Sequence, residues 1–327
     1  MAEDYRRYID ELTEEINRQL AQLVPHKEPA DLYEPARYVL EAPGKRLRPL
    51  LLLLSAGIFD VPEEDAMPAA LALEVFHTFT LVHDDIMDRA DARRGKPTVH
   101  MRWDEGTAIL CGDWLMGLSY QLLSRVPRGD LRAILNRYHN MVTRLCEGQA
   151  LDKAFETRQD VTLEAYMQMI EGKTGALIQT ALVTGGLLSE APEEVIEKLE
   201  AMGWHLGRAF QIQDDLLDVV AEDKAWGKPV GGDLVEGKKT FLLLRALEKA
   251  EGEDARFFNE LVARGGLEPS RIPEARERMR TLGVLDDARE EVQRHYEEAQ
   301  SFLAYLPSNR AAHTLQWLLE TMSNRVR

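Results

Sequence analysis

Two groups of aspartates in this chain share one spacing: two adjacent residues, a gap of two, then a third. The groups lie in "FTLVHDDIMDRADARRGKPTVH" (residues 79–100) and in "FQIQDDLLDVV" (residues 210–220). In chain order their members are Asp84, Asp85, Asp88, Asp214, Asp215 and Asp218. In a helix, residues four apart share one face, so like charges gather on it. Such carboxylates suit Mg²⁺, which commonly binds one or two of them together with substrate phosphates and water.

A solvated acidic turn would explain one such group. Two matching groups in the two halves of the chain predict more, namely facing walls of one cavity. Without metal ions that arrangement is electrostatically expensive, because the carboxylates repel one another. The pair of motifs therefore favours a functional site.

Basic residues flank both acidic groups. They lie in "PGKRLRP" (43–49), "RRGKPTVH" (93–100), "EGKTG" (171–175) and "WGKPVGGDLVEGKKT" (226–240). The cations are Lys45, Arg46, Arg48, Arg93, Arg94, Lys96, Lys173, Lys228, Lys238 and Lys239. Each alone would be an ordinary surface charge, but guanidinium and ammonium groups beside Mg²⁺-binding carboxylates are what diphosphate recognition requires.

The composition sets the class of protein. The chain has 327 residues, of which 45% are hydrophobic and 29% charged, as in a soluble globular protein with a sizeable core. The net charge of −16 argues against a nucleic-acid partner. The two cysteines imply no disulfide framework, and the charged N-terminus has no apolar core of the signal-peptide kind. The longest apolar run, residues 49–59, is too short to span a bilayer. We expect a cytoplasmic protein without stable membrane insertion.

The elements that carry these residues are predicted to be helices. Ile9, Leu12, Ile16, Leu20 and Leu23 recur at steps of three and four, which lines one helix face. Similar spacing predicts helices over residues 63–90, 104–125, 130–156, 162–187, 192–222, 238–250, 283–305 and 308–325. Asp60 with Glu63, and Ser308 after Pro307, resemble helix starts. Strand signals are nearly absent.

No long linker or shift in composition divides the chain, so we expect one all-helical domain over residues 1–327. Some segments, such as "GALIQTALVTGGLL" (175–188), are apolar on most of their circumference. Such helices lie in the middle of a large bundle or at a subunit interface, which makes a homodimer plausible.

Taken together, these motifs resemble those of the trans-isoprenyl diphosphate synthases, the polyprenyl synthetase family. The resemblance covers about residues 35–250, and the motifs occur in the family's order. Pro43 is a departure, since the family usually has a second glycine there. The resemblance implies a large helical bundle around a central cavity, the isoprenoid synthase-like fold. It also implies an enzyme that joins isopentenyl diphosphate to an allylic diphosphate by ionisation, condensation and elimination.

The resemblance also implies roles for single residues. The aspartates of both groups would hold about three Mg²⁺ on the allylic diphosphate, which Arg93, Lys173, Lys228 and Lys238 would bind directly. Isopentenyl diphosphate would be bound by Lys45, Arg48, His77 and Arg94. Thr174 and Gln211, with Lys173, would lie near the ionising carbon. For His77 the alternative is a core histidine bonded to a backbone carbonyl; it lies two helical turns before Asp84 on nearly the same face.

The residues before the first acidic group bear on product length. Phe79 is five residues before Asp84, roughly 7.5 Å back along a helix, and Phe76 lies a further turn back. In the family, a bulky aromatic residue at this position is typical of the short-chain enzymes. Thr80 beside it is small, which favours a geranylgeranyl over a farnesyl product. Ordinary core packing of Phe79 is the alternative.

Other classes of protein fit less well. A class I terpene cyclase usually has a second metal motif of a different kind and needs no isopentenyl site. A regulatory subunit of an active synthase would be expected to lose one aspartate group or its basic partners. A metal-binding scaffold without catalysis would not explain the ordered basic motifs.

Overall fold

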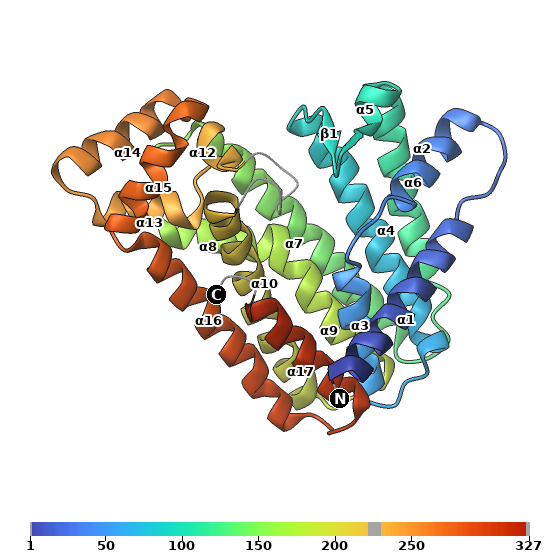
Figure 1. Cartoon of the computed structure of the whole chain (residues 1–327). Coiled ribbons are helices and arrows are strands. Elements are labelled where there is room, and N and C mark those ends of the chain that lie inside the picture. Colours follow the sequence, from blue (N-terminus) through green and yellow to red (C-terminus); the bar gives the residue numbers. More distant parts are fainter. Residues whose placement is uncertain (1, 222–229, 325–327) are drawn as a thin grey trace. The chain divides into compact units, whose positions relative to one another are not determined.

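The computed structural model of the chain describes residues 2–221 and 230–324 (Figure 1). Lys228, predicted to bind the allylic diphosphate, lies outside the described residues. The described chain is almost entirely helical, which confirms the all-α prediction. It divides into two compact units, each assembled from separate stretches of sequence. The single domain predicted over residues 1–327 stays a prediction.

The first unit comprises residues 1–138, 180–200 and 303–318. Its elements are α1 (Ala2–Gln22), α2 (Ala30–Leu40), α3 (Leu47–Ile58), α4 (Glu63–Met87), β1 (Ala92–Arg93), β2 (Lys96–Pro97), α5 (Val99–Arg102) and α6 (Glu105–Leu123). Figure 1 shows α4 among α3, α6 and α1, and it packs mainly against α6 and α3. The helix that carries the first acidic group is therefore central in its unit.

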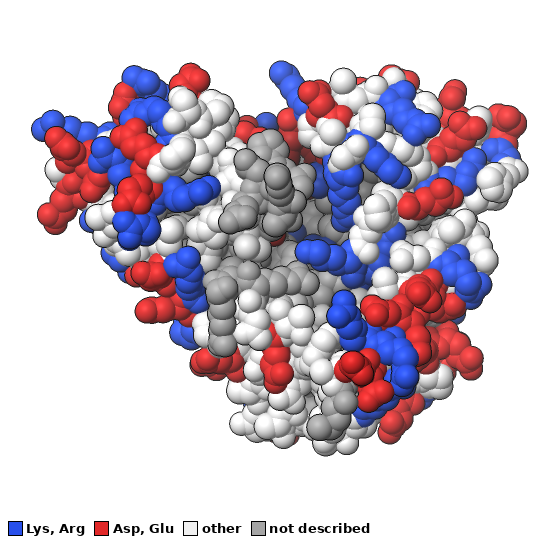
Figure 2. Space-filling model, in the orientation of Figure 1, with Lys and Arg blue, Asp and Glu red and all other residues white. Residues whose placement is uncertain are grey.

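The second unit comprises residues 139–179, 201–302 and 319–327. Its elements are α8 (Leu163–Ile170), the π-helical turn η1 (Glu171–Gly175), α12 (Gly232–Val235), α13 (Phe241–Lys249), α14 (Gly252–Arg264), η2 (Pro269–Arg271), α15 (Ile272–Thr281) and α16 (Val284–Ser301). Helix α13 packs mainly against α16 and α14. On α14, η2 and α15, acidic and basic side chains are interspersed (Figure 2), with ion pairs such as Arg271 with Glu274 and Arg264 with Glu260. Five elements contribute residues to both units: α7 (Leu131–Thr157), α9 (Ala176–Leu188), α10 (Glu193–Val220), η3 (Phe302–Tyr305) and α17 (Arg310–Ser323).

Helix α4 owes its central place to its apolar surface. Its buried residues lie around most of its circumference, from Ala66 and Met67 to Phe76 and Val82. By length and composition alone α4 could cross a membrane, but 67% of its most apolar window is buried inside the protein. The central helix of a bundle has this pattern.

The helix predictions agree with the structure in kind but differ at some ends. The predicted helix over residues 162–187 is interrupted by η1, and no prediction covered α2, α3, α5, α12, α14 or α15. The predicted helix start at residue 63 is confirmed, but the capping box predicted from Asp60 and Glu63 is wrong: Pro62 is the N-cap of α4, and Asp60 adopts a positive φ of 56°. At α17 the cap is Asn309 rather than Ser308, because the Asn309 side chain accepts a hydrogen bond from the Ala312 N–H at 3.1 Å.

Candidate active site

The first acidic group lies at the C-terminal end of α4. Asp84 is partly exposed, Asp88 is exposed, and Asp88 is also the C-cap residue. Asp85 is buried, and its Oδ1 accepts a hydrogen bond from Arg93 Nε at 2.7 Å. Burial raises the pKa of the Asp85 carboxyl, and the charge of Arg93 opposes that shift. Because the last carbonyls of a helix carry partial negative charge, this end of α4 favours a bound cation beside Asp84 and Asp88.

The two adjacent arginines separate at a tight hairpin. Strand β1 pairs antiparallel with β2, and the two-residue turn consists of Arg94 and Gly95, with φ of 52° and 74°. Two positive φ angles define the turn geometry that suits the twist of a hairpin. Arg93 therefore points to Asp85 from the strand, whereas Arg94 Nη1 donates to the Pro43 carbonyl at 2.6 Å. The sequence did not predict this hairpin, because its turn is Arg-Gly and not the Asn-Gly or Asp-Gly that is typical of such turns.

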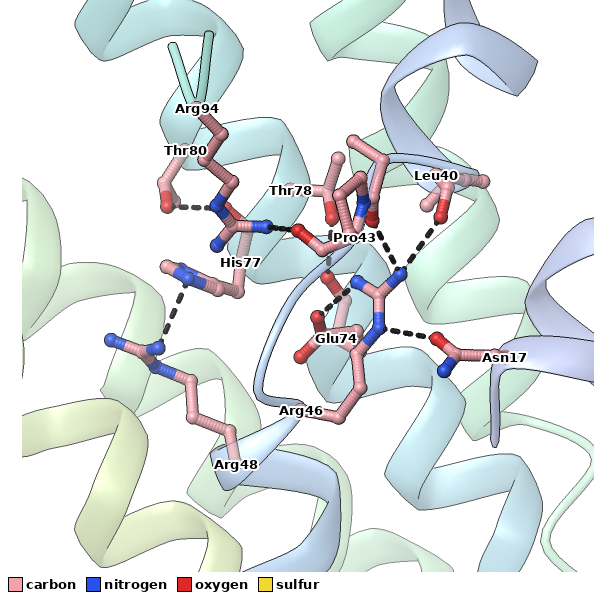
Figure 3. Close-up of polar contacts among 11 residues, drawn as sticks. Asn17, Leu40, Pro43, Arg46, Arg48, Glu74, His77, Thr78, Thr80 and Arg94 are labelled. Atoms are coloured by element: carbon pink, nitrogen blue, oxygen red, sulfur yellow. Dashed lines mark hydrogen bonds and ion pairs between the residues drawn. The ribbon is translucent and has the colours of Figure 1, made fainter. Parts of the chain in front are cut away.

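Arg46 differs from the cations around it (Figure 3). The sequence placed it with Lys45 and Arg48 beside a diphosphate, but its side chain is buried and paired with Glu74, Nη1 to Oε1 at 2.7 Å. Lys45 is exposed. The motif therefore contains a buried cation, Arg46, next to an exposed one, Lys45. The two have the same charge, and only their burial distinguishes them.

His77 pairs with Arg48 rather than with a backbone carbonyl. Figure 3 shows Arg48 Nη1 directed at His77 Nε2, 3.0 Å away. Burial, and then the positive charges of Arg48, Arg94 and Arg93, hold the pKa of His77 well below its ordinary value. Since an arginine can only donate, Nε2 accepts this bond and the neutral ring carries its proton on Nδ1. His77 thus directs the Arg48 guanidinium.

One cavity in the first unit joins these parts. It is lined by the ends of α2 and α4 and by the hairpin; its polar lining includes Arg46, Glu74, His77, Asp85, Arg93, Arg94 and Lys96. Tyr38 of α2 anchors the hairpin there, since its hydroxyl donates to the Pro97 carbonyl at 2.7 Å. Residues from three separate motifs therefore meet at one place in the first unit.

In the second unit, Asp215 is the centre of a buried hydrogen-bond network. Its Oδ2 accepts from the Tyr166 hydroxyl at 2.6 Å and from the Phe241 N–H at 3.0 Å, and its Oδ1 accepts from Gln211 Nε2 at 3.0 Å. The Thr174 hydroxyl donates to Gln211 Oε1 at 2.8 Å. Burial, with the nearby charge of Asp233, raises the pKa of Asp215 to about 7. The network fixes the amide of Gln211 and, through it, Thr174.

The other two aspartates of this group differ from Asp215. Asp214 is exposed, while Asp218 is buried and its Oδ2 accepts a hydrogen bond from the Asp233 N–H at 3.1 Å. Lys238 Nζ lies 3.7 Å from Asp233 Oδ1. Each acidic group therefore combines solvent-accessible and buried aspartates: Asp85 is the buried member of the first group, and Asp214 is the exposed member of the second.

Lys173 lies in the π-helical turn η1, and its ammonium contacts Asp152 Oδ2 at 2.6 Å. Sequence reasoning missed Asp152, Tyr166, Asp233 and Glu74 as partners of site residues. Only Asp233 had a signal, its place inside a basic motif.

The phenylalanines near the first acidic group form part of an aromatic row on α4. The rings of Phe76 and Phe79 lie 5.2 Å apart between centroids, and His83 lies 4.9 Å from Phe79. Phe76 is fully buried, whereas Phe79 is half-buried. Thr80 turns its hydroxyl back to the His77 carbonyl at 2.8 Å. Of the two phenylalanines, Phe79 is thus the less buried.

The solvent-accessible carboxylates of the two groups fit a hard divalent cation. Across residues 2–221 and 230–324, no three His, Cys, Asp or Glu side chains converge as a ready-made metal site. Mg²⁺ does not need one, because substrate phosphates and water complete its octahedral shell. Asp84 and Asp88 at the end of α4, and Asp214 on α10, offer suitable oxygens.

Comparison with known proteins agrees with this chemistry. Residues 29–279 match the sequence model of the family called polyprenyl synthetase. The chain is 43% identical over 236 residues to a geranylgeranyl diphosphate synthase of Methanosarcina mazei, covering 72% of this chain and 73% of the relative. It is 38% identical over 335 residues to a geranylfarnesyl diphosphate synthase of Natronomonas pharaonis, covering 97% and 96%. The crystal structure of a geranylgeranyl pyrophosphate synthetase from Pyrococcus horikoshii superimposes with a TM-score of 0.92 at 37% identity, covering 99% of each chain.

Proposed function

Since the chain belongs to the polyprenyl synthetase family and is a trans-prenyltransferase, we propose that its main product is geranylgeranyl diphosphate. It would form this product by adding isopentenyl diphosphate to dimethylallyl, geranyl or farnesyl diphosphate. The observation that carries the proposal is the cavity of the first unit, where arginines from the hairpin and the buried Asp85 meet His77. The geranylgeranyl synthases among the relatives favour this product over the farnesyl one.

The residues divide the work between two diphosphates. We assign isopentenyl diphosphate to Lys45, Arg48, His77 and Arg94, because Arg48 and His77 already form a directed pair. Arg93, Lys173, Lys228 and Lys238 would bind the allylic diphosphate. Divalent metal ions are typical of the family, and about three Mg²⁺ would neutralise charge on the leaving diphosphate. Asp84, Asp88 and Asp214 would be their direct ligands, with Asp85, Asp215 and Asp218 holding neighbouring groups in place.

The fixed amide and hydroxyl of Gln211 and Thr174 would lie against the ionising carbon. Their hydrogen bonds to one another and to Asp215 keep both dipoles in one orientation, which costs no reorganisation during the reaction. An apolar cavity would protect the carbocation from water. The departed diphosphate would take the final proton, as the family resemblance implies.

The wild-type protein tests this proposal directly. Purified chain is incubated with Mg²⁺, labelled isopentenyl diphosphate and each allylic starter in turn, and the chain length of the product is measured. We expect geranylgeranyl diphosphate from every starter. A farnesyl or geranylfarnesyl product would change the assignment of length, and no condensation with any starter would refute the function.

Phe79→Ala is expected to lengthen the product by one or more isoprene units. Phe79 is the half-buried member of the aromatic row, so its removal opens space along α4 for a longer tail. Phe302→Ala, which removes another half-buried aromatic ring in the second unit, is the matched control and should leave the product unchanged. An unchanged product distribution for Phe79→Ala would assign Phe79 to core packing alone.

His77→Gln is expected to keep the KM for isopentenyl diphosphate near the wild-type value, whereas His77→Leu should raise it by about tenfold, because the Arg48 donor then faces no acceptor. Since the folded pKa of His77 lies below the unfolded value of about 6.5, the ring stays neutral from pH 8 to 6.5. The unfolded chain takes up its proton first, so stability falls as the pH drops below that value. A rise in KM centred near pH 6.5 that is absent in His77→Gln would contradict this assignment.

We further propose that the protein is a cytoplasmic homodimer. Ile109 and Leu110 on α6 are 42% and 62% exposed, and adjacent exposed apolar side chains on a helix favour a protein partner. A second copy of this chain is the simplest one, in keeping with the apolar segments noted in the sequence.

A further inference from the structure

Arg46 stands between two residues that we assign to isopentenyl diphosphate, but its own guanidinium is buried and already bonded to protein acceptors. Its side chain is only 5% exposed overall, whereas Lys45 is exposed. Figure 3 shows the guanidinium turned away from Arg48 and His77, into the space among α1, α2 and α4. A cation in this position has another task.

The Arg46 guanidinium joins three helices. Nη1 donates to Glu74 Oε1 of α4 at 2.7 Å, and Nε donates to Asn17 Oδ1 of α1 at 2.8 Å. Nη2 donates to the carbonyls of Leu40 and Ala42, at 3.1 and 2.8 Å. These carbonyls lie at and just beyond the end of α2, where the helix itself offers no partners. Arg46 therefore closes α2 and attaches its end to the other two helices.

The same contacts hold a strained turn of the chain. Arg46 has a φ of 47°, in the left-handed region that non-glycine residues rarely adopt, and it is the N-cap residue of α3. Such a conformation persists only where surrounding bonds over-determine it. The turn decides where Lys45 projects and where the first turn of α3, with Arg48, begins.

Helix α4 binds two residues of this motif: Arg46, at the end of the loop of residues 41–46, and Arg48, in the first turn of α3. Glu74 binds Arg46, and His77, three residues later on the same face, binds Arg48. From outside, Arg94 grips the loop through the Pro43 carbonyl. Gly44 leaves room for it, because a Cβ there would lie 2.7 Å from Arg94 Nη1. The loop of residues 41–46 is thus held by one buried arginine and one exposed arginine.

We propose that Arg46 and Glu74 are positioning residues for isopentenyl diphosphate, acting through Lys45 and Arg48 without touching the substrate. The proposal rests on the assigned function of this loop. If the pair positions these residues, its loss should weaken the binding of isopentenyl diphosphate but not the binding of the allylic diphosphate. Loss of an ordinary stabilising contact would not make this distinction. The allylic diphosphate is assigned to Arg93 and to residues outside this loop.

The test compares Glu74→Gln with Ser55→Ala. The first keeps the shape of the side chain but leaves the Arg46 charge uncompensated. The second removes another buried hydrogen bond of α3, from the Ser55 hydroxyl to the Leu182 carbonyl at 2.7 Å, well along the helix from the loop. For Glu74→Gln we expect the KM for isopentenyl diphosphate to rise by about tenfold, while the KM for the allylic diphosphate stays within about twofold. Ser55→Ala should lower Tm with both KM values unchanged.

Arg46→Lys gives a second, independent variant. A lysine keeps the charge, but a single ammonium cannot meet four acceptors in this planar arrangement, so the same split in KM is expected. The affinity of each variant for isopentenyl diphosphate, measured by calorimetry below its Tm, tests the positioning role in the absence of turnover. If the wild-type chain condensed no starter but bound isopentenyl diphosphate more tightly than Glu74→Gln, the positioning role of Arg46 and Glu74 would be supported and the proposed function would be refuted. Equal rises in the KM for isopentenyl diphosphate and the KM for the allylic diphosphate would refute the positioning role. A fall in Tm with no change in either KM would refute it as well.

Discussion

Asp84→Asn is expected to lower kcat by a factor on the order of 10³ while leaving the fold intact, since the lost carboxylate would hold a metal ion against the leaving diphosphate. Asp84 lies partly exposed at the end of α4, so its replacement removes charge without opening the core. Asparagine keeps the size of the side chain but gives Mg²⁺ a weaker ligand. The measurement is steady-state turnover at saturating concentrations of both substrates, with Tm measured in parallel.

The control for this substitution is Asp10→Asn, an exposed aspartate on α1 outside every motif. It should leave kcat and Tm unchanged. Asp214→Asn should resemble Asp84→Asn, because Asp214 is the exposed carboxylate of the second group. If Asp84→Asn kept more than about a tenth of the wild-type kcat, the end of α4 would not be a catalytic metal site.

The second large effect concerns the metal itself. Protein treated with a chelator should show no measurable turnover, and added Mg²⁺ should restore it. We expect Mg²⁺ and inorganic diphosphate together to raise Tm by about 5 °C or more, because a ligand that binds only the folded state stabilises it. Either one alone should raise Tm much less, since the carboxylates need phosphate oxygens to complete the metal's shell and the cations alone bind diphosphate weakly.

Asp84→Asn separates this effect from simple anion binding. In that variant the joint shift should shrink, whereas a shift caused only by diphosphate on the arginines would persist. Full activity in the presence of excess chelator would rule out a metal-dependent reaction.

The parts of this site that sequence could predict are those with repeated or ordered patterns. The matching spacing of the two acidic groups led to the prediction of Asp84 and Asp214 as candidate metal ligands, and the helical period of the apolar residues predicted most of the helices that carry them. Spacing could not divide each group into solvent-accessible and buried members. Asp85 and Asp215 differ from their neighbours only in what surrounds them, Arg93 for one and Tyr166 for the other.

The misses have the same cause. Arg46 and Lys45 are adjacent cations, and only tertiary packing turns one inward to Glu74. Lys173 had no visible partner in the sequence because Asp152 lies 21 positions away. The Arg94–Gly95 hairpin escaped because its turn contains a residue type that rarely adopts a positive φ. Long-range partners and unusual backbone conformations are decided by the fold as a whole.

Arg94 has a left-handed backbone conformation, so substitutions at this position that raise thermal stability are expected to lower catalytic activity. Glycine or asparagine would adopt the same φ of 52° with less strain and would suit the hairpin better. Either would remove the guanidinium that holds the Pro43 carbonyl and that we assign to isopentenyl diphosphate. Engineering that selects only for heat resistance would therefore favour changes at Arg94 that weaken the enzyme, and libraries meant to stabilise this scaffold should leave the hairpin tip fixed.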